Sequence, residues 1–127
     1  DYRMPGDVSG LVTLVGVTER LMAITLPLAT AKALTSRVLR TVSDDSGFEM
    51  TFDCVGEMAS IVAGQVKGRF VHTHFESEIS TPSVVFGQNH EIHYRSDLPA
   101  YTVEFSSEIG AIALQLCVRD REREDPK

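Results

Sequence analysis

The 127-residue chain has few cysteines, no long hydrophobic run and no cluster of basic residues, and each absence excludes a class of protein. Two cysteines do not make a disulfide scaffold, so we expect Cys54 and Cys117 to be free, buried thiols in a reducing cytosol. The apolar runs are far shorter than the roughly 20 residues of a membrane span. The net charge is −6 and the 12 Lys and Arg residues are scattered, which argues against nucleic-acid binding. We therefore predict a soluble, cytoplasmic protein with no membrane or nucleic-acid partner.

The strong local signatures of catalysis and metal binding are also missing. The sequence contains no Walker loop, no Gly-x-Gly-x-x-Gly, no Gly-x-Ser-x-Gly and no Cys-x-x-Cys. The four histidines form two pairs, His72 with His74 and His90 with His93, without a cysteine or carboxylate cluster near them in the sequence. Two ligands do not complete a zinc site, so we interpret these residues as surface or turn histidines and predict no metal site.

Hydrophobic periodicity predicts two strands, then two helices, then several strands. The expected elements are strands 8–16 and 20–26, helices 28–41 and 49–70, and strands 76–81, 83–86, 90–95, 100–106 and 111–118. Turn-forming residues at 87–89, 96–99 and 107–110 separate the strands from residue 83 onward, and we expect the last three strands to form an antiparallel meander. This order indicates an α+β fold, in which an antiparallel sheet packs with two long central helices. We predict one domain over residues 1–118 and a charged, solvated tail over 119–127.

The most informative feature of the chain is a polar stripe on the otherwise apolar second helix. At about 100° per residue, the side chains of Asp53, Glu57 and Ser60 fall within an arc of about 60°. Gly64 and Lys67 continue the same line. This face is either the solvated side of an amphipathic helix or a platform that contacts a partner. A solvated face usually carries more long charged residues than this stripe, which includes a serine and a glycine.

Three glycines interrupt the second helix, at Gly56, Gly64 and Gly68. Each costs about 1 kcal/mol relative to alanine in a helix interior. We therefore expect a backbone or a partner to approach the helix closely at these positions.

The second helix and the segment 80–92 resemble the CheX, CheC and FliY family of chemotaxis phosphatases. That family is similar in an Asp/Ser-x-x-x-Glu-x-x-Asn helix, followed about 20 residues later by a proline. Asp53, Glu57 and Pro82 match three of these positions. The resemblance spans about residues 8–118 and is strongest for the CheX branch, which has one such helix. The N-terminal helix that usually opens family members is not expected within this chain.

The resemblance implies dephosphorylation of a phosphorylated, CheY-like receiver domain in chemotaxis or two-component signalling. It assigns to Glu57 a salt bridge with the active-site lysine of the receiver, and to the motif asparagine the positioning of the attacking water. The receiver carries the Mg²⁺, so this chain needs no cofactor of its own. The resemblance also implies a homodimer formed through the sheets. Such chemistry needs few groups, because phosphoryl transfer depends mainly on positioning and electrostatic stabilisation.

The departure from the family pattern is Ser60, which stands where the family has asparagine. A serine hydroxyl is held closer to the backbone than an amide and offers a different donor and acceptor geometry. Two hypotheses therefore stay open. The chain is a phosphatase with Glu57 and Ser60 as catalytic residues, or a non-catalytic module that binds a receiver or another signalling partner. In both, Asp53, Glu57, Gly64 and Lys67 contact the partner. In a third reading, the chain is an unrelated α+β domain with a solvated stripe.

Overall fold

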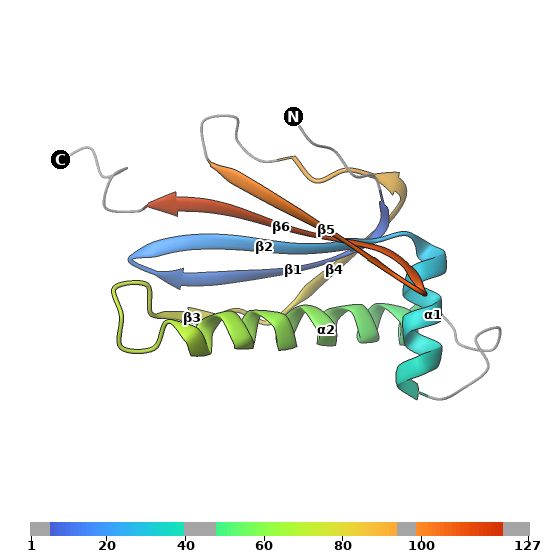
Figure 1. Ribbon diagram of the computed structural model, residues 1–127, viewed down its shortest axis with the longest axis horizontal. Coiled ribbons are helices and arrows are strands. Elements are labelled where there is room, and N and C mark those ends of the chain that lie inside the picture. The colour runs from blue at the N-terminus through green and yellow to red at the C-terminus, as the bar shows by residue number, and fades with distance from the viewer. Residues whose placement is uncertain (1–5, 40–47, 94–98, 121–127) are drawn as a thin grey trace.

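The computed structural model describes residues 6–39, 48–93 and 99–120, which form a six-stranded antiparallel sheet with two helices on one side (Figure 1). The elements are β1 (Gly6–Gly16), β2 (Thr18–Leu26), α1 (Leu28–Leu39), α2 (Phe48–Arg69), β3 (Ser77–Ile79), β4 (Ser83–His90), β5 (Ala100–Ser107) and β6 (Gly110–Asp120). The strand order is β3-β1-β2-β6-β5, and β4 also pairs with β1, on the edge that β3 shares. The predicted α+β fold class is confirmed. No helix in these three ranges has the length and apolar character needed to cross a membrane.

The core lies between the central strands and α2. Strand alternation directs one set of β1 and β2 side chains toward the helices, and the largest of these are almost completely inaccessible to solvent. This set comprises Val8, Val12, Leu14, Met22, Ile24 and Leu26. From α2, Val55 and Ala59 pack against them. Gly10 lets the helix come close, because a Cβ there would lie 3.0 Å from the Cβ of Ala59.

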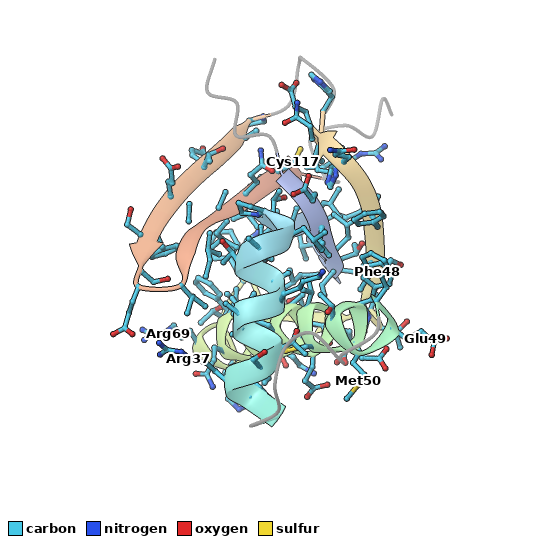
Figure 2. All side chains as sticks on the ribbon, turned by 90° about the vertical axis from the view of Figure 1, so that its right-hand side faces the viewer. Arg37, Phe48, Glu49, Met50, Arg69 and Cys117 are labelled. Carbon is cyan, nitrogen blue, oxygen red and sulfur yellow. The ribbon has the colours of Figure 1, made fainter. Side chains whose placement is uncertain are left out.

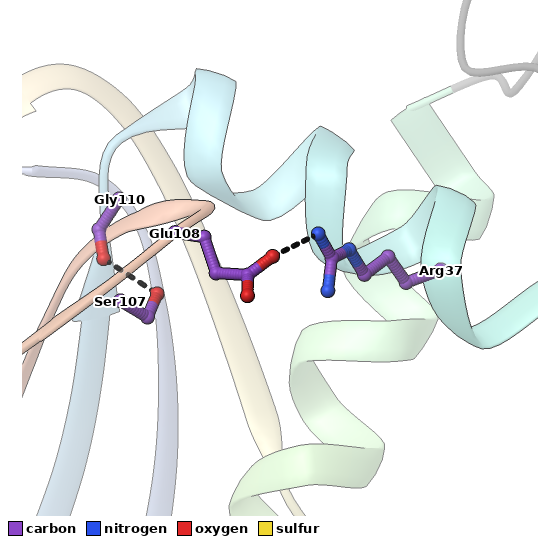
Figure 3. Close-up of polar contacts among 4 residues, drawn as sticks. All are labelled: Arg37, Ser107, Glu108 and Gly110. Carbon is purple, nitrogen blue, oxygen red and sulfur yellow. Dashed lines mark hydrogen bonds and ion pairs between the residues drawn. The ribbon is translucent and has the colours of Figure 1, made fainter.

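Helix α1 contacts the sheet near both of its ends. Its first backbone N–H, that of Leu28, donates to Asp7 Oδ2 of β1 at 2.7 Å. Near its other end, Arg37 Nη2 lies 2.6 Å from Glu108 Oε1 in the β5–β6 turn (Figure 3). The guanidinium of Arg37 lowers the pKa of the Glu108 carboxyl by hydrogen bonding and by charge. Gly110, at φ +130°, also touches α1, because a Cβ there would collide with Thr30.

The predicted turn at 87–89 is wrong, because β4 continues through it to His90. Asn89 takes the left-handed conformation, φ +57°, and its N–H donates to Asp7 Oδ1 at 2.7 Å. The pairing of β1 with β4 shifts register between Gly6 and Val8. The turn-forming residues therefore produce an irregularity inside β4 instead of ending it. Strand β4 continues because the Asp7 carboxylate of β1 accepts the hydrogen bond from Asn89.

The predicted meander is also wrong in part. Strands β5 and β6 form the expected hairpin, but the strand expected at 90–95 does not join it, because His90 ends β4, which pairs with β1 at the opposite side of the sheet. Of the strand expected at 90–95, only His90 is extended in the sheet, and 91–93 are not in a strand. Residues 94 and 95, and residues 96–98 of the turn expected at 96–99, lie outside the described residues. Strand β6 runs to Asp120, two residues into the segment expected to be a tail.

Candidate functional site

The polar stripe lies on the side of α2 that faces away from the sheet. Asp53 and Glu57 are exposed, and Ser60 and Gly64 are partly exposed. Toward the other described residues, the side chains of Asp53, Glu57 and Ser60 make no hydrogen bond and no ion pair. The fold thus brings these predicted residues together on one surface and leaves their polar atoms available to a partner.

One flank of the stripe is closed by β4 and the residue before it. Gly56 is buried, and a Cβ at this position would lie 3.1 Å from Val84 Cγ2 and 3.7 Å from Pro82 Cγ. Pro82 therefore packs against α2 at Gly56, the residue that precedes Glu57 in the helix. The close packing predicted at Gly56 is confirmed, and the helix and the proline of the sequence motif are neighbours in space.

Gly64 and Gly68 behave differently from Gly56. A Cβ added at either position would meet no atom of the described residues within 4 Å, apart from the local helix backbone and adjacent residues. The close approach expected at these two glycines is therefore not made by the described part of the fold, and approach by a partner stays a prediction. The physical reason is that successive side chains of a helix point about 100° apart. Ala63 points to the sheet and is buried, so Gly64 points outward. The fold itself gives no reason for a glycine at position 64.

Lys67 ends the stripe and is tied to the sheet edge. Its Nζ lies 3.2 Å from Glu78 Oε1 on β3, and the Glu78 side chain is 86% exposed. Exposed ion pairs of this kind contribute little to stability and exchange readily. The ammonium of Lys67 can therefore still turn to an acidic group on a partner.

The other flank of the stripe is open. A groove of about 510 Å³ lies between α1 and α2, and we call it the α1–α2 groove. Figure 2 views the molecule from the side on which α1 stands in front of α2, with Met50 at the lower end of the view. The lining is apolar except for two carboxylates of the stripe, and comprises Leu34, Val38, Met50, Asp53, Cys54, Glu57, Met58 and Ile61. Sequence reasoning missed this groove, although Val38, Met50 and Ile61 are apolar residues that the structure leaves exposed.

The cysteines and histidines take no part in a metal site within the described ranges, where no three His, Cys, Asp or Glu side chains come together. Neither cysteine is in a disulfide, and Cys117 is buried as predicted, whereas Cys54 is only partly buried. His90 is neither the surface nor the turn histidine that we expected, because it is partly buried and ends strand β4. Its Nδ1–H donates to Gly87 O at 2.7 Å, and its Nε2 lies 2.7 Å from the buried Ser9 Oγ.

The chain is similar to a known protein family and to solved structures of its members. The family model described as "Chemotaxis phosphatase CheX" matches residues 8–106. The chain is 25% identical to the solved CheX of Desulfovibrio desulfuricans, with a TM-score of 0.82 over 94% of this chain and 79% of that one. It is 30% identical to CheX of Vibrio vulnificus, with a TM-score of 0.81 over 91% and 78% of the two chains. A CheX–CheY–BeF3–Mg²⁺ complex from Borrelia burgdorferi matches with 25% identity and a TM-score of 0.75, over 89% and 76%. No curated protein sequence matches.

Proposed function

This chain belongs to the CheX family of chemotaxis phosphatases, and from this premise we propose that it dephosphorylates a CheY-like receiver domain. The observation that carries the proposal is the outward face of α2, where Glu57 and Ser60 lie about one helical turn apart with unengaged polar atoms. Pro82 packs beside the same turn, as the family motif requires. A family member in a complex with CheY, BeF3 and Mg²⁺ supports the choice of partner.

In the proposed mechanism, Glu57 is the docking carboxylate. It is exposed and unpaired within the described chain, so it can form an ion pair with the receiver's active-site lysine at small cost in desolvation. That contact places the next turn of α2, with Ser60, over the phosphoryl group. Mg²⁺ is carried by the receiver and stabilises charge on the phosphoryl oxygens.

Ser60 is the residue that orients the attacking water in this proposal. Its hydroxyl can donate one hydrogen bond and accept two, which is sufficient to hold one water molecule. The hydroxyl reaches less far than the amide of the family asparagine, and an error of about 1 Å in position can cost on the order of 100-fold in rate. We therefore expect the reaction to be slower than that of an otherwise identical site with asparagine.

The serine also supports a second candidate function, a binding module that docks the receiver through Glu57 without catalysis. One assay separates the two candidates. A CheY-like receiver from the same organism is phosphorylated with acetyl phosphate, and its decay is followed with wild type, Glu57→Ala, Ser60→Ala and Ser60→Asn.

If the chain is a phosphatase, wild type accelerates the decay, both alanine variants lose the acceleration and Ser60→Asn increases it. If only Ser60→Asn accelerates the decay, the chain is a binding module. If no variant accelerates it and no receiver binds, the proposed partner is wrong.

Asp53, Gly64 and Lys67 complete the proposed contact surface along the same line of α2. Asp53 lies one turn before Glu57, and Gly64 one turn after Ser60, where the absence of a side chain lets the receiver approach the helix backbone. Lys67 supplies the only positive charge of the stripe. The proposal thus assigns two carboxylates, one cation and one close approach to a single partner surface.

We also propose a homodimer formed through the β5 edge. β5 pairs with β6 on one side, and no other described strand pairs with it. Its apolar residues Tyr101, Val103 and Phe105 lie opposite core-packed residues of β6, on the helix face of the sheet, and are 59%, 50% and 50% exposed. Antiparallel pairing of two β5 strands would satisfy the free backbone groups and cover these side chains. We expect light scattering to give a dimer mass for wild type and a monomer mass for Val103→Lys. A monomeric wild type at micromolar concentration would contradict the proposal.

A further inference from the structure

We propose that the α1–α2 groove is a second contact site for the same partner, and that it binds apolar side chains on the receiver surface next to the receiver's lysine. This inference rests on the proposed function and extends it from the stripe to α1. The groove adds affinity and selects receivers, and it takes no part in the chemistry.

The core of the domain accounts for only part of the apolar lining of the groove, namely Leu34 and Met58, which pack against it. Val38 and Ile61 are 60% and 56% exposed, although each lies on a helix whose opposite side is buried against the fold. A volume of about 510 Å³ lies inside the range of about 300–1,000 Å³ that is typical of binding sites. Exposed apolar residues that line a concave surface of this size indicate a place where another molecule binds.

The charges of the groove define what that molecule carries. Asp53 and Glu57 are the only charged residues in the lining. A partner that fills the groove must therefore present apolar side chains beside a cation, because burying the carboxylates without a counter-charge would be unfavourable. A receiver lysine with apolar neighbours has this composition. Glu57 belongs to both the stripe and the groove, so one lysine contact positions the partner over both.

The two flanks of the stripe differ in shape, and this difference supports contact on the α1 side. On the β4 side, Gly56 is already packed against Val84 and Pro82. On the α1 side the groove is open. A receiver docked on Glu57 can thus bury additional apolar area in this groove, next to the carboxylate. Met50 and Met58 suit such a surface, because their flexible side chains adapt to different partners.

The test uses Val38→Ser and Ile61→Ser, two changes at exposed positions that should leave the fold intact. The matched control is Val71→Ser, which removes an exposed valine, 39% accessible, after the end of α2. We measure the dissociation constant of a CheY-like receiver loaded with BeF3 and Mg²⁺ by calorimetry. We expect each groove variant to bind about 10-fold more weakly than wild type, and Val71→Ser to bind like wild type.

Glu57→Ala distinguishes failure of this inference from failure of the proposed function. If Glu57→Ala weakens binding while Val38→Ser and Ile61→Ser bind like wild type, the groove is not a contact site and the proposed function stands. If wild type does not bind the receiver at all, the proposed function fails and this inference fails with it. An equal loss in Val71→Ser would show a general effect of the substitutions and would also overturn the groove assignment.

The two cysteines provide an independent measurement on the unmodified chain. Cys54 lines the groove, whereas Cys117 is only 6% exposed and lies in β6. We expect iodoacetamide to alkylate Cys54 readily in the free protein, and a saturating amount of the BeF3-loaded receiver to slow this reaction at least 10-fold. Cys117 reports global unfolding and should react slowly in both samples. Alkylation of Cys54 at the same rate with and without bound receiver would overturn the inference.

Discussion

Gly56 and Gly64 lie about two turns apart on the same helix, and each lowers the helix propensity of α2 by about 1 kcal/mol relative to alanine. Their surroundings differ completely. Gly56 is covered by Val84 and Pro82, and its missing side chain lets the sheet edge approach. Gly64 faces open space. The fold therefore explains the glycine on the inner flank of α2, whereas it does not explain the glycine on the outer stripe, where we propose that a partner binds. The two flanks should therefore respond differently to substitution.

The largest expected effect is the cost of adding a side chain at the covered glycine. We expect Gly56→Leu to lower the free energy of unfolding by about 2–3 kcal/mol, because the new atoms would overlap Val84. Gly64→Leu is the matched control and should cause no loss, since no neighbour stands within 4 Å. Urea denaturation of both variants measures the difference. Equal destabilisation of the two would remove the distinction between the flanks.

The next effect concerns Asp7, which belongs to the part of the molecule that the fold explains. Backbone N–H donors, first that of Leu28 and then that of Asn89, lower the pKa of its carboxyl. Asp7→Ala is expected to reduce the free energy of unfolding by about 1 kcal/mol at pH 7, as for other helix-capping side chains. Gly56, Asp7 and their neighbours should thus matter for stability and not for receiver binding.

The pH dependence of this contribution follows from the direction of the shift. Because the folded pKa is lower than the unfolded one, the contribution is present above the ordinary aspartate pKa of about 3.9. It is lost as the pH falls through the lowered folded pKa. Thermal unfolding between pH 7 and pH 3 should therefore show a smaller acid loss for Asp7→Ala than for wild type. Parallel curves would contradict the assigned role of the carboxylate.

A smaller effect, of opposite sign, is expected at the open glycines. Gly64→Ala and Gly68→Ala should each raise the free energy of unfolding by about 0.5–1 kcal/mol, because alanine favours the helix and meets no neighbour. Only Gly64 lies within the proposed contact line, so only Gly64→Ala should weaken receiver binding, which calorimetry would detect. Unchanged binding by Gly64→Ala would show that no close approach occurs there.

The smallest effect is expected for the ion pair between Arg37 and Glu108. Both side chains are well exposed, at 61% and 80%, and exposed pairs contribute little. Glu108→Gln should therefore shift the melting temperature less than any change above, and should not alter the affinity of the groove for the receiver. A large loss of binding in this variant would mean that the position of α1 depends on this contact.

The sequence alone predicts the elements with strong periodicity, and the failures have physical causes. The hairpin of β1 and β2 and the long helix α2 carry clear alternating or helical patterns, and the stripe follows from the helix geometry. The composition of the segment Gly87-Gln88-Asn89 is compatible with a turn and also with an irregular strand, so composition alone does not predict which of the two forms. Asp7 decides between these outcomes, and it lies far away in the sequence. The α1–α2 groove is lined by residues of both helices, so its shape depends on how α1 packs against α2. The sequence pattern of either helix alone does not predict this packing.

The central claim is that the outer face of α2 docks a receiver through Glu57. The most direct measurement is the dissociation constant of a BeF3- and Mg²⁺-loaded CheY-like receiver for wild type and Glu57→Gln, with Glu104→Gln as a control at an exposed carboxylate of β5. We expect wild type and the control to bind equally, and Glu57→Gln to bind at least 10-fold more weakly, because the lysine loses its counter-charge. Equal affinity of all three proteins, or no binding by any, would contradict the claim.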